Sequence, residues 1–250
     1  MNERYELGSV SPISCWSHWF VLLIALSGSL VMIEPAPVDV ITVGIALLLF
    51  ATGLRLPRGF LLPLGFLGLF LFGNLLSIPF AENVSAATVY FAVTAYLVLA
   101  LVLHTALMYW QYERLMVFFW AGYLMAAVIA TLAAVAGFLQ LLPDPDLFTL
   151  NGRASGTFKD PNVYGPFLVP ALLYLINGLD KHRGLTRYFY TVLGLFLLFG
   201  IFVSFSRGAF LNFALALLVM LGIKLYIADS LRQFSQYFVG GTGLLLLLLV

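Results

Sequence analysis

The segment Tyr188–Ile223, with the sequence YFYTVLGLFLLFGIFVSFSRGAFLNFALALLVMLGI, decides how this chain folds. It is almost continuously apolar, and it is much longer than the roughly 20 residues that a helix needs to cross a bilayer. Its one charged residue, Arg207, lies in the short stretch Ser204–Gly208. The segment therefore predicts two membrane-spanning helices joined by a tight turn at Ser204–Gly208.

The composition of the whole chain supports the same class of protein. Its 250 residues are 62% hydrophobic and 9% charged, and the mean hydropathy is +1.05. Soluble domains carry about 25% charged residues, so we expect an all-α, polytopic integral membrane protein. Eight apolar segments are long enough to span the membrane: residues 16–33, 38–54, 60–80, 85–108, 115–141, 162–179, 188–205 and 208–227.

A ninth apolar segment begins near Tyr237. The chain ends at Val250, before this segment is long enough to cross a hydrocarbon core about 30 Å thick. We therefore expect residues 1–250 to form a single transmembrane domain, the N-terminal part of a longer chain.

The positive charges indicate which side of the membrane each loop faces. Nine of the 12 Lys and Arg residues fall on one side of the eight segments, which the positive-inside rule makes cytoplasmic together with the N-terminus. These are Arg4, Arg55, Arg58, Arg114, Lys181, Arg183, Arg187, Lys224 and Arg232. The other three, Arg153, Lys159 and Arg207, fall on the outer side, where cations need a specific reason.

The loop before the sixth segment, Gly152–Asn162 with the sequence GRASGTFKDPN, favours the start of a helix. Asp160 followed by Pro161 predicts an N-cap and a first helical residue. Two glycines, Gly152 and Gly156, permit backbone conformations that other residues resist. The free N–H groups and the positive dipole end of such a helix would face the outer side, and together they attract anions.

Two cations of this loop, Arg153 and Lys159, strengthen the prediction of an anion site. An Arg side chain can grip a phosphate with two parallel hydrogen bonds, and a Lys side chain adds a point charge. The alternative is a solvated loop with no specific ligand, in which these cations pair with Asp144, Asp146 or Asp160.

Arg207 makes a second candidate anion site. Ser206 is a natural N-cap for the last full segment, so we expect Arg207 and Gly208 at the start of an outward-facing helix end. A cation at a helix N-terminus opposes the dipole, and a bound anion between them would turn this repulsion into attraction. The alternative is an Arg side chain that extends to the lipid head groups.

Other classes of function find little support. The net charge is only +1, which does not suggest nucleic-acid binding. Cys15 is the one cysteine, so an intrachain disulfide is impossible. His18, His104 and His182 are scattered along the chain, so we expect no metal site.

The two stretches together resemble a known family. Arg153, Gly156-Thr157-Phe158 and Pro161-Asn162 match the R-x-x-G-t-f-x-x-P-N signature of the O-antigen ligase and O-antigen polymerase superfamily. Ser204, Ser206 and Gly208 around Arg207 match its S-x-S-R-G signature. Outside these motifs the likeness is only that of a multi-span hydrophobic chain.

The resemblance implies a GT-C-like glycosyltransferase of the bacterial inner membrane. Such a protein takes a glycan from undecaprenyl diphosphate at the periplasmic face and passes it to lipid A core or to a growing polysaccharide, without a metal or another cofactor. It implies that Arg153, Arg207 and Lys159 bind the diphosphate, supported by Gly156, Asp160, Pro161, Asn162, Ser206 and Gly208. It also places the catalytic base, a His of a large periplasmic loop, beyond residue 250, so the catalytic residue is unknown.

The primary interpretation is therefore a glycan ligase, and two alternatives stay open. One is an O-antigen or exopolysaccharide polymerase of the same superfamily. The other is a transporter, such as a flippase for a lipid-linked glycan. A transporter is expected to place charged residues or broken helices near the middle of the membrane. The predicted spans hold almost no ionisable residues in their interiors, which favours chemistry at the surface.

Overall fold

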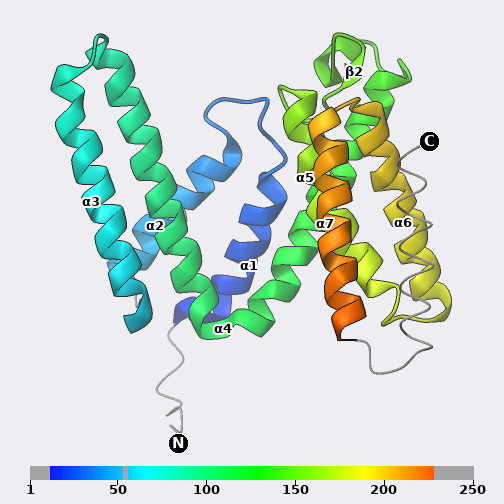
Figure 1. The fold of residues 1–250 in the computed structure, drawn as a ribbon, viewed down its shortest axis with the longest axis horizontal. Helices are drawn as coiled ribbons and strands as arrows, with labels where there is room; N and C mark the ends of the chain where they lie inside the picture. Colours follow the sequence, from blue (N-terminus) through cyan, green and yellow to red (C-terminus); the bar gives the residue numbers. More distant parts are fainter. Residues whose placement is uncertain (1–11, 53–55, 228–250) are drawn as a thin grey trace, which may run out of the picture. The chain divides into compact units, whose positions relative to one another are not determined.

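The computed structural model describes residues 12–52 and 56–227, and these are mostly helical (Figure 1). Five helical stretches are long and apolar enough to cross a membrane: Arg58–Phe80, Val84–Tyr109, Tyr112–Phe138, Gly184–Val203 and Arg207–Tyr226. By length and composition, the described residues thus fit an all-α membrane protein. The expected ninth segment at Tyr237 lies outside the described residues, as do Arg4, Arg55 and Arg232.

The chain divides into two compact units. The first contains Met1–Ser27 and Pro35–Gly122, and the second contains Gly28–Glu34 and Tyr123–Val250. One long helix, α4 (Val84–Phe138), contributes residues to both. The expected single transmembrane domain stays a prediction, and each unit is described by itself.

The first unit is built from apolar helices. Its elements are α1 (Pro12–Ser27), α2 (Pro37–Thr52), the 3-10 turn η1 (Arg58–Phe60), α3 (Leu61–Ser77), the 3-10 turn η2 (Ile78–Phe80) and the first part of α4. Helices α1 and α2 pack against each other. Their buried apolar side chains meet those of α4 in one cluster: Val21, Ile24, Ile45, Ala46, Leu103, Leu107 and Leu115.

Helix α3 shows why this unit suits a lipid environment. None of its residues is buried, and the apolar side chains of Leu62, Phe66 and Leu69 each expose more than half of their surface. A soluble helix hides an apolar stripe and turns polar residues to water. A helix that is apolar all round and fully exposed is stable in hydrocarbon, where exposing Leu and Phe carries no penalty.

The loop expected at Arg114, between the fourth and fifth segments, is not present. Residues Val84–Phe138 form one continuous α-helix, and Arg114 lies within it. Hydropathy detects the polar residues Glu113 and Arg114, but both are good helix formers, so polarity there does not end the helix. Two span-length stretches lie within this helix, Val84–Tyr109 and Tyr112–Phe138, and they correspond to the predicted fourth and fifth segments.

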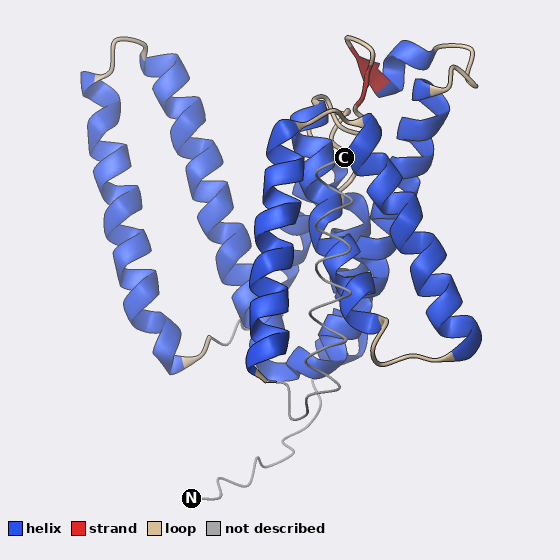
Figure 2. Cartoon of the chain, turned by 45° about the vertical axis from the view of Figure 1, so that its right-hand side comes forward, coloured by secondary structure: helices blue, strands red, loops and turns tan. Residues whose placement is uncertain are grey.

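The second unit surrounds the candidate motifs. After the end of α4 come the 3-10 turn η3 (Pro145–Phe148), the strands β1 (Thr149–Leu150) and β2 (Arg153–Ala154), and the helices α5 (Pro161–Gly178), α6 (Gly184–Val203) and α7 (Arg207–Tyr226). Helix α5 packs against both α6 and α7, and the strand pair is the only sheet among the described residues (Figure 2).

Small residues let these three helices approach closely. A Cβ atom on Gly165 of α5 would lie 2.6 Å from Cβ of Ala209 and 2.8 Å from Oγ of Ser204. A Cβ atom on Gly200 of α6 would lie 2.6 Å from the hydroxyl of Tyr164. Such contacts between small residues replace the hydrophobic effect as the means of helix association in lipid.

The first predicted span ends earlier than expected. Helix α1 stops at Ser27, and residues 28–34 leave the helix and join the second unit. The N–H of Val31 donates to the carbonyl of Thr157 at 3.2 Å, and the Thr157 hydroxyl donates to the carbonyl of Ser29 at 2.6 Å. Gly28 and Ser29 weaken the helix, and the Thr157 bonds stabilise the non-helical path.

Lys224 lies inside α7, within the predicted span 208–227. It lies in the last turn of α7, is buried, and forms an ion pair with Asp180, which follows α5. Its cation also suits the negative end of the α7 dipole. Its partner Asp180 lies more than 40 residues away in sequence, so local hydropathy could not reveal the ion pair.

Candidate anion-binding site

A β-hairpin carries Arg153. Strands β1 and β2 pair antiparallel, with Leu150 opposite Arg153, and the turn between them is Asn151-Gly152. Both turn residues have positive φ, 52° and 75°, which is the conformation of a type I′ hairpin turn. We did not predict this hairpin from the sequence, although Asn-Gly is the strongest short-range signal for one.

The segment after the hairpin is buried in the second unit. All residues from Ala154 to Phe158 are buried, and the N–H groups of Ser155 and Gly156 donate to the carbonyl of Phe148 at 2.9 and 3.0 Å. Gly156 has φ 56°, and a Cβ atom there would lie 2.5 Å from the carbonyl oxygen of Ala130 in α4. The predicted need for glycine at this position is confirmed, and the reason is both backbone conformation and lack of space.

Helix α5 starts where the sequence predicted. Asp160 is its N-cap, with a side chain that accepts from the N–H of Asn162 at 2.7 Å, and Pro161 is the first helical residue. The carboxylate thus satisfies one free donor of the helix end. Because the Asp160 carboxylate accepts this hydrogen bond, its role in the structure is to stabilise the start of α5.

The turn between α6 and α7 is three residues long and is held by its own serines. Ser206 is the N-cap of α7, and its hydroxyl accepts from the N–H of Ala209 at 3.2 Å, as predicted. Ser204 is the C-cap of α6, and its hydroxyl donates to the carbonyl of Ile201 at 2.6 Å. Between the two buried serines, Phe205 has φ 46° and is 58% exposed.

Arg153 connects the hairpin to both helix starts. Its Nε atom donates to the carbonyl of Ser204 at 3.0 Å, and its Nη2 atom donates to Oδ1 of Asn162 at 2.9 Å. The N-termini of α5 and α7 therefore lie together, as the contact of Gly165 with Ala209 also shows. The two motifs are therefore brought together at one end of the second unit.

Arg207 differs from Arg153 in its surroundings. It is the first residue of α7 and is exposed, as is Gly208. Its guanidinium group makes no hydrogen bond or ion pair with any other described residue. It lies at the positive end of the α7 dipole, an unfavourable place for a cation without a counter-ion.

Lys159 is paired within the protein. Its ammonium group forms an ion pair with Glu34, and both side chains are largely exposed. The hydrogen bond from Lys159, together with its charge, lowers the pKa of Glu34 below the ordinary value of a Glu side chain. The alternative for this loop was that its cations pair with Asp144, Asp146 or Asp160. For Lys159 the acid is instead Glu34. Glu34 lies 125 residues away in sequence, so local spacing could not reveal it.

The acids of the loop have the surroundings of solvated groups. Asp144 and Asp146 are exposed on either side of Pro145, and neither forms an ion pair with another described residue. Within residues 12–52 and 56–227, no group of three or more His, Cys, Asp or Glu side chains is arranged to hold a metal ion.

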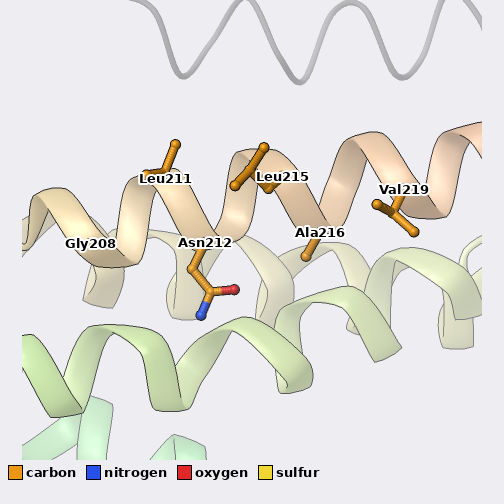
Figure 3. Close-up of a pocket in the computed structure, with 6 residues that line it drawn as sticks. All are labelled: Gly208, Leu211, Asn212, Leu215, Ala216 and Val219. Carbon is orange, nitrogen blue, oxygen red and sulfur yellow. The ribbon is translucent and has the colours of Figure 1, made fainter.

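A groove of about 560 Å³ runs along α7 from the residue next to Arg207 (Figure 3). The described residues that line it recur at helical spacing on one face of α7: Gly208, Leu211, Asn212, Leu215, Ala216 and Val219. Asn212 is the one polar side chain among them, and Leu211, Leu215 and Val219 each expose more than half of their surface.

Comparisons of the chain with protein-family models, with curated proteins and with solved structures find no match.

Proposed function

We propose that this chain belongs to a glycan ligase that takes its donor from undecaprenyl diphosphate and transfers the glycan to lipid A core or a similar acceptor. The observation that carries the proposal is Arg207, an exposed cation with no partner among the described residues, at a helix N-terminus beside a second helix N-terminus. The resemblance of the two motifs to the ligase and polymerase superfamily agrees with this placement.

A diphosphate suits these surroundings for a physical reason. An anion between Arg207 and the N-terminus of α7 would be attracted by both and would relieve their mutual repulsion. When the glycan leaves, the diphosphate gains negative charge, and a fixed cation stabilises that charge most strongly where water is scarce. Arg207 would therefore assist departure of the leaving group as well as binding of the donor.

The groove along α7 supports a lipid-linked donor. It starts at Gly208, next to the proposed diphosphate position, and continues past Leu211, Leu215 and Val219. An isoprenoid chain could lie along this apolar face while its charged head stays at Arg207.

Several finer features belong to the same proposal. They are eight full spans plus a ninth, a GT-C-like arrangement, the bacterial inner membrane as location, and a cytoplasmic N-terminus. The polymerase alternative shares the donor site and differs in the acceptor. The flippase alternative needs no leaving group, so it would require Arg207 for binding but would yield no new glycosidic product.

The test is replacement of Arg207 in the host that carries the gene. Arg207→Ala is expected to abolish glycan transfer at normal protein level in the membrane, and Arg207→Lys to restore it only in part, because an ammonium group keeps the charge but loses the planar fork. The product identifies the acceptor: glycan on lipid A core supports a ligase, and longer free or lipid-linked polysaccharide supports a polymerase.

The matched controls are Arg183→Ala and Arg187→Ala, two exposed arginines near the start of α6. They remove the same charge at the other end of the helices and are expected to leave transfer near normal. Binding of undecaprenyl diphosphate to the purified protein should also weaken at least tenfold in Arg207→Ala, the loss of one charge-assisted bond. Normal transfer and binding in Arg207→Ala would contradict the proposal.

A further inference from the structure

The two arginines of the site are not electrostatically equivalent. Arg153 lies at the C-terminus of α6, where the carbonyl of the C-cap Ser204 accepts its Nε hydrogen. A helix C-terminus carries partial negative charge, so this cation has a favourable contact with the end of α6, beside its bond to Asn162 in the first turn of α5. Arg207 lies at the positive N-terminus of α7 and has no described partner. Of the two, Arg207 is the cation that needs an external anion.

The turn that Arg153 contacts is strained. Phe205 has φ 46°, a left-handed conformation that costs free energy for a residue with a Cβ atom. Its side chain is 58% exposed, and its ring lies 6.2 Å, between centroids, from the ring of Phe138. Such a conformation persists only when neighbouring bonds fix it. The bond from Arg153 to the Ser204 carbonyl, one residue before Phe205, is one of the bonds that can fix it.

Asn162 orients Arg153 from the other side. Its Oδ1 atom accepts from Nη2 of Arg153, while its own N–H donates to the N-cap carboxylate of Asp160. A continuous chain of hydrogen bonds therefore runs from Asp160 through Asn162 and Arg153 to Ser204. It connects the start of α5 to the turn from which Arg207 projects.

We propose that Arg153 and Asn162 are positioning residues, which hold the α6–α7 turn so that Arg207 meets the anion. The inference rests on the proposed function and gives Arg207 a different role from Arg153 and Asn162. Arg207 contacts the diphosphate, whereas Arg153 acts on it through the turn and Asn162 acts through Arg153. Lys159, paired with Glu34, stands outside this chain of bonds.

The test measures the turn itself, without substrate. In the full chain with Cys15→Ser, a nitroxide spin label is attached at Phe205→Cys, and the protein is placed in lipid nanodiscs. Asn162→Ala and Arg153→Ala are expected to convert a restricted spectrum into a mobile one. The double variant should be no more mobile than Arg153→Ala alone, because both residues act through one bond network. Arg207→Ala should leave the spectrum restricted.

The conservative variant separates positioning from a general structural role. In Asn162→Asp, a carboxylate accepts the same hydrogen bond from Arg153, so the label should be restricted again. Glycan transfer in the host should fall about tenfold in Asn162→Ala and recover in Asn162→Asp. A restricted label in both Arg153→Ala and Asn162→Ala would overturn the inference.

The outcome for the proposed function is read separately. A mobile label in Asn162→Ala together with full transfer in Arg207→Ala would support the positioning of the turn and overturn the proposed function alone. A restricted label in all variants, together with loss of transfer in Arg207→Ala, would overturn the positioning of the turn and support the proposed function.

Discussion

Gly152 and Gly156 have the same backbone conformation but different surroundings. Both have positive φ, yet Gly152 has open space around its Cα, whereas Gly156 faces the carbonyl of Ala130. The sequence indicated that both glycines permit backbone conformations that other residues resist. It could not predict that only Gly156 is packed against α4, because the contact partner lies 26 residues earlier in the chain.

This difference predicts unequal mutants. Gly156→Ala places a methyl group 2.5 Å from the Ala130 oxygen and should destabilise the protein by about 2–4 kcal/mol, the sum of left-handed strain and overpacking. Gly152→Asn should cost less than about 1 kcal/mol, because Asn tolerates positive φ and the position is open. Thermal unfolding of the purified protein in detergent measures both. Equal losses of stability in the two variants would contradict this account of Gly156.

The starts of α5 and α7 were predictable because capping is a local matter. Asp160-Pro161 and Ser206-Arg207 each place a side-chain acceptor within reach of N–H groups two or three residues later. The continuity of α4 through Arg114 was not predictable from polarity, which reports on solvation and not on backbone hydrogen bonds. The hairpin at Asn151 was missed because its strands are only two residues long.

The caps can be tested as a pair. Asp160→Ala and Ser206→Ala each remove an acceptor and should lower stability by about 1 kcal/mol. Asp160→Asn and Ser206→Thr keep an acceptor oxygen at the same place and should stay close to the starting protein. Thermal unfolding compares each Ala variant with its conservative partner. If both members of a pair unfold at the same temperature, the cap bond contributes nothing to that helix.

The charges of the second unit separate along its helices. Arg153 contacts the start of α5 through Asn162, Arg207 begins α7, and Lys224 lies at the other end of α7, paired with Asp180. Arg207 and Lys224 are about 25 Å apart along the helix axis at 1.5 Å per residue, close to the thickness of a bilayer core. The sequence predicted this separation from charge counts. It could not predict which helices pack together, because a small residue such as Gly165 does not specify its partner.

The separation of charge predicts an orientation in the membrane. Since loops rich in Lys and Arg stay in the cytoplasm, Arg183 at the start of α6 should face the cytoplasm, and the loop of Asp146 should face the opposite side. In a Cys15→Ser background, Asp146→Cys should react with a membrane-impermeant maleimide in spheroplasts. Arg183→Cys should react only after the membrane is opened. Both positions are exposed, so a difference in labelling reports the side of the membrane and not burial. Labelling of position 183 in sealed spheroplasts would reverse the orientation, place Arg207 in the cytoplasm, and remove a periplasmic lipid diphosphate as its ligand.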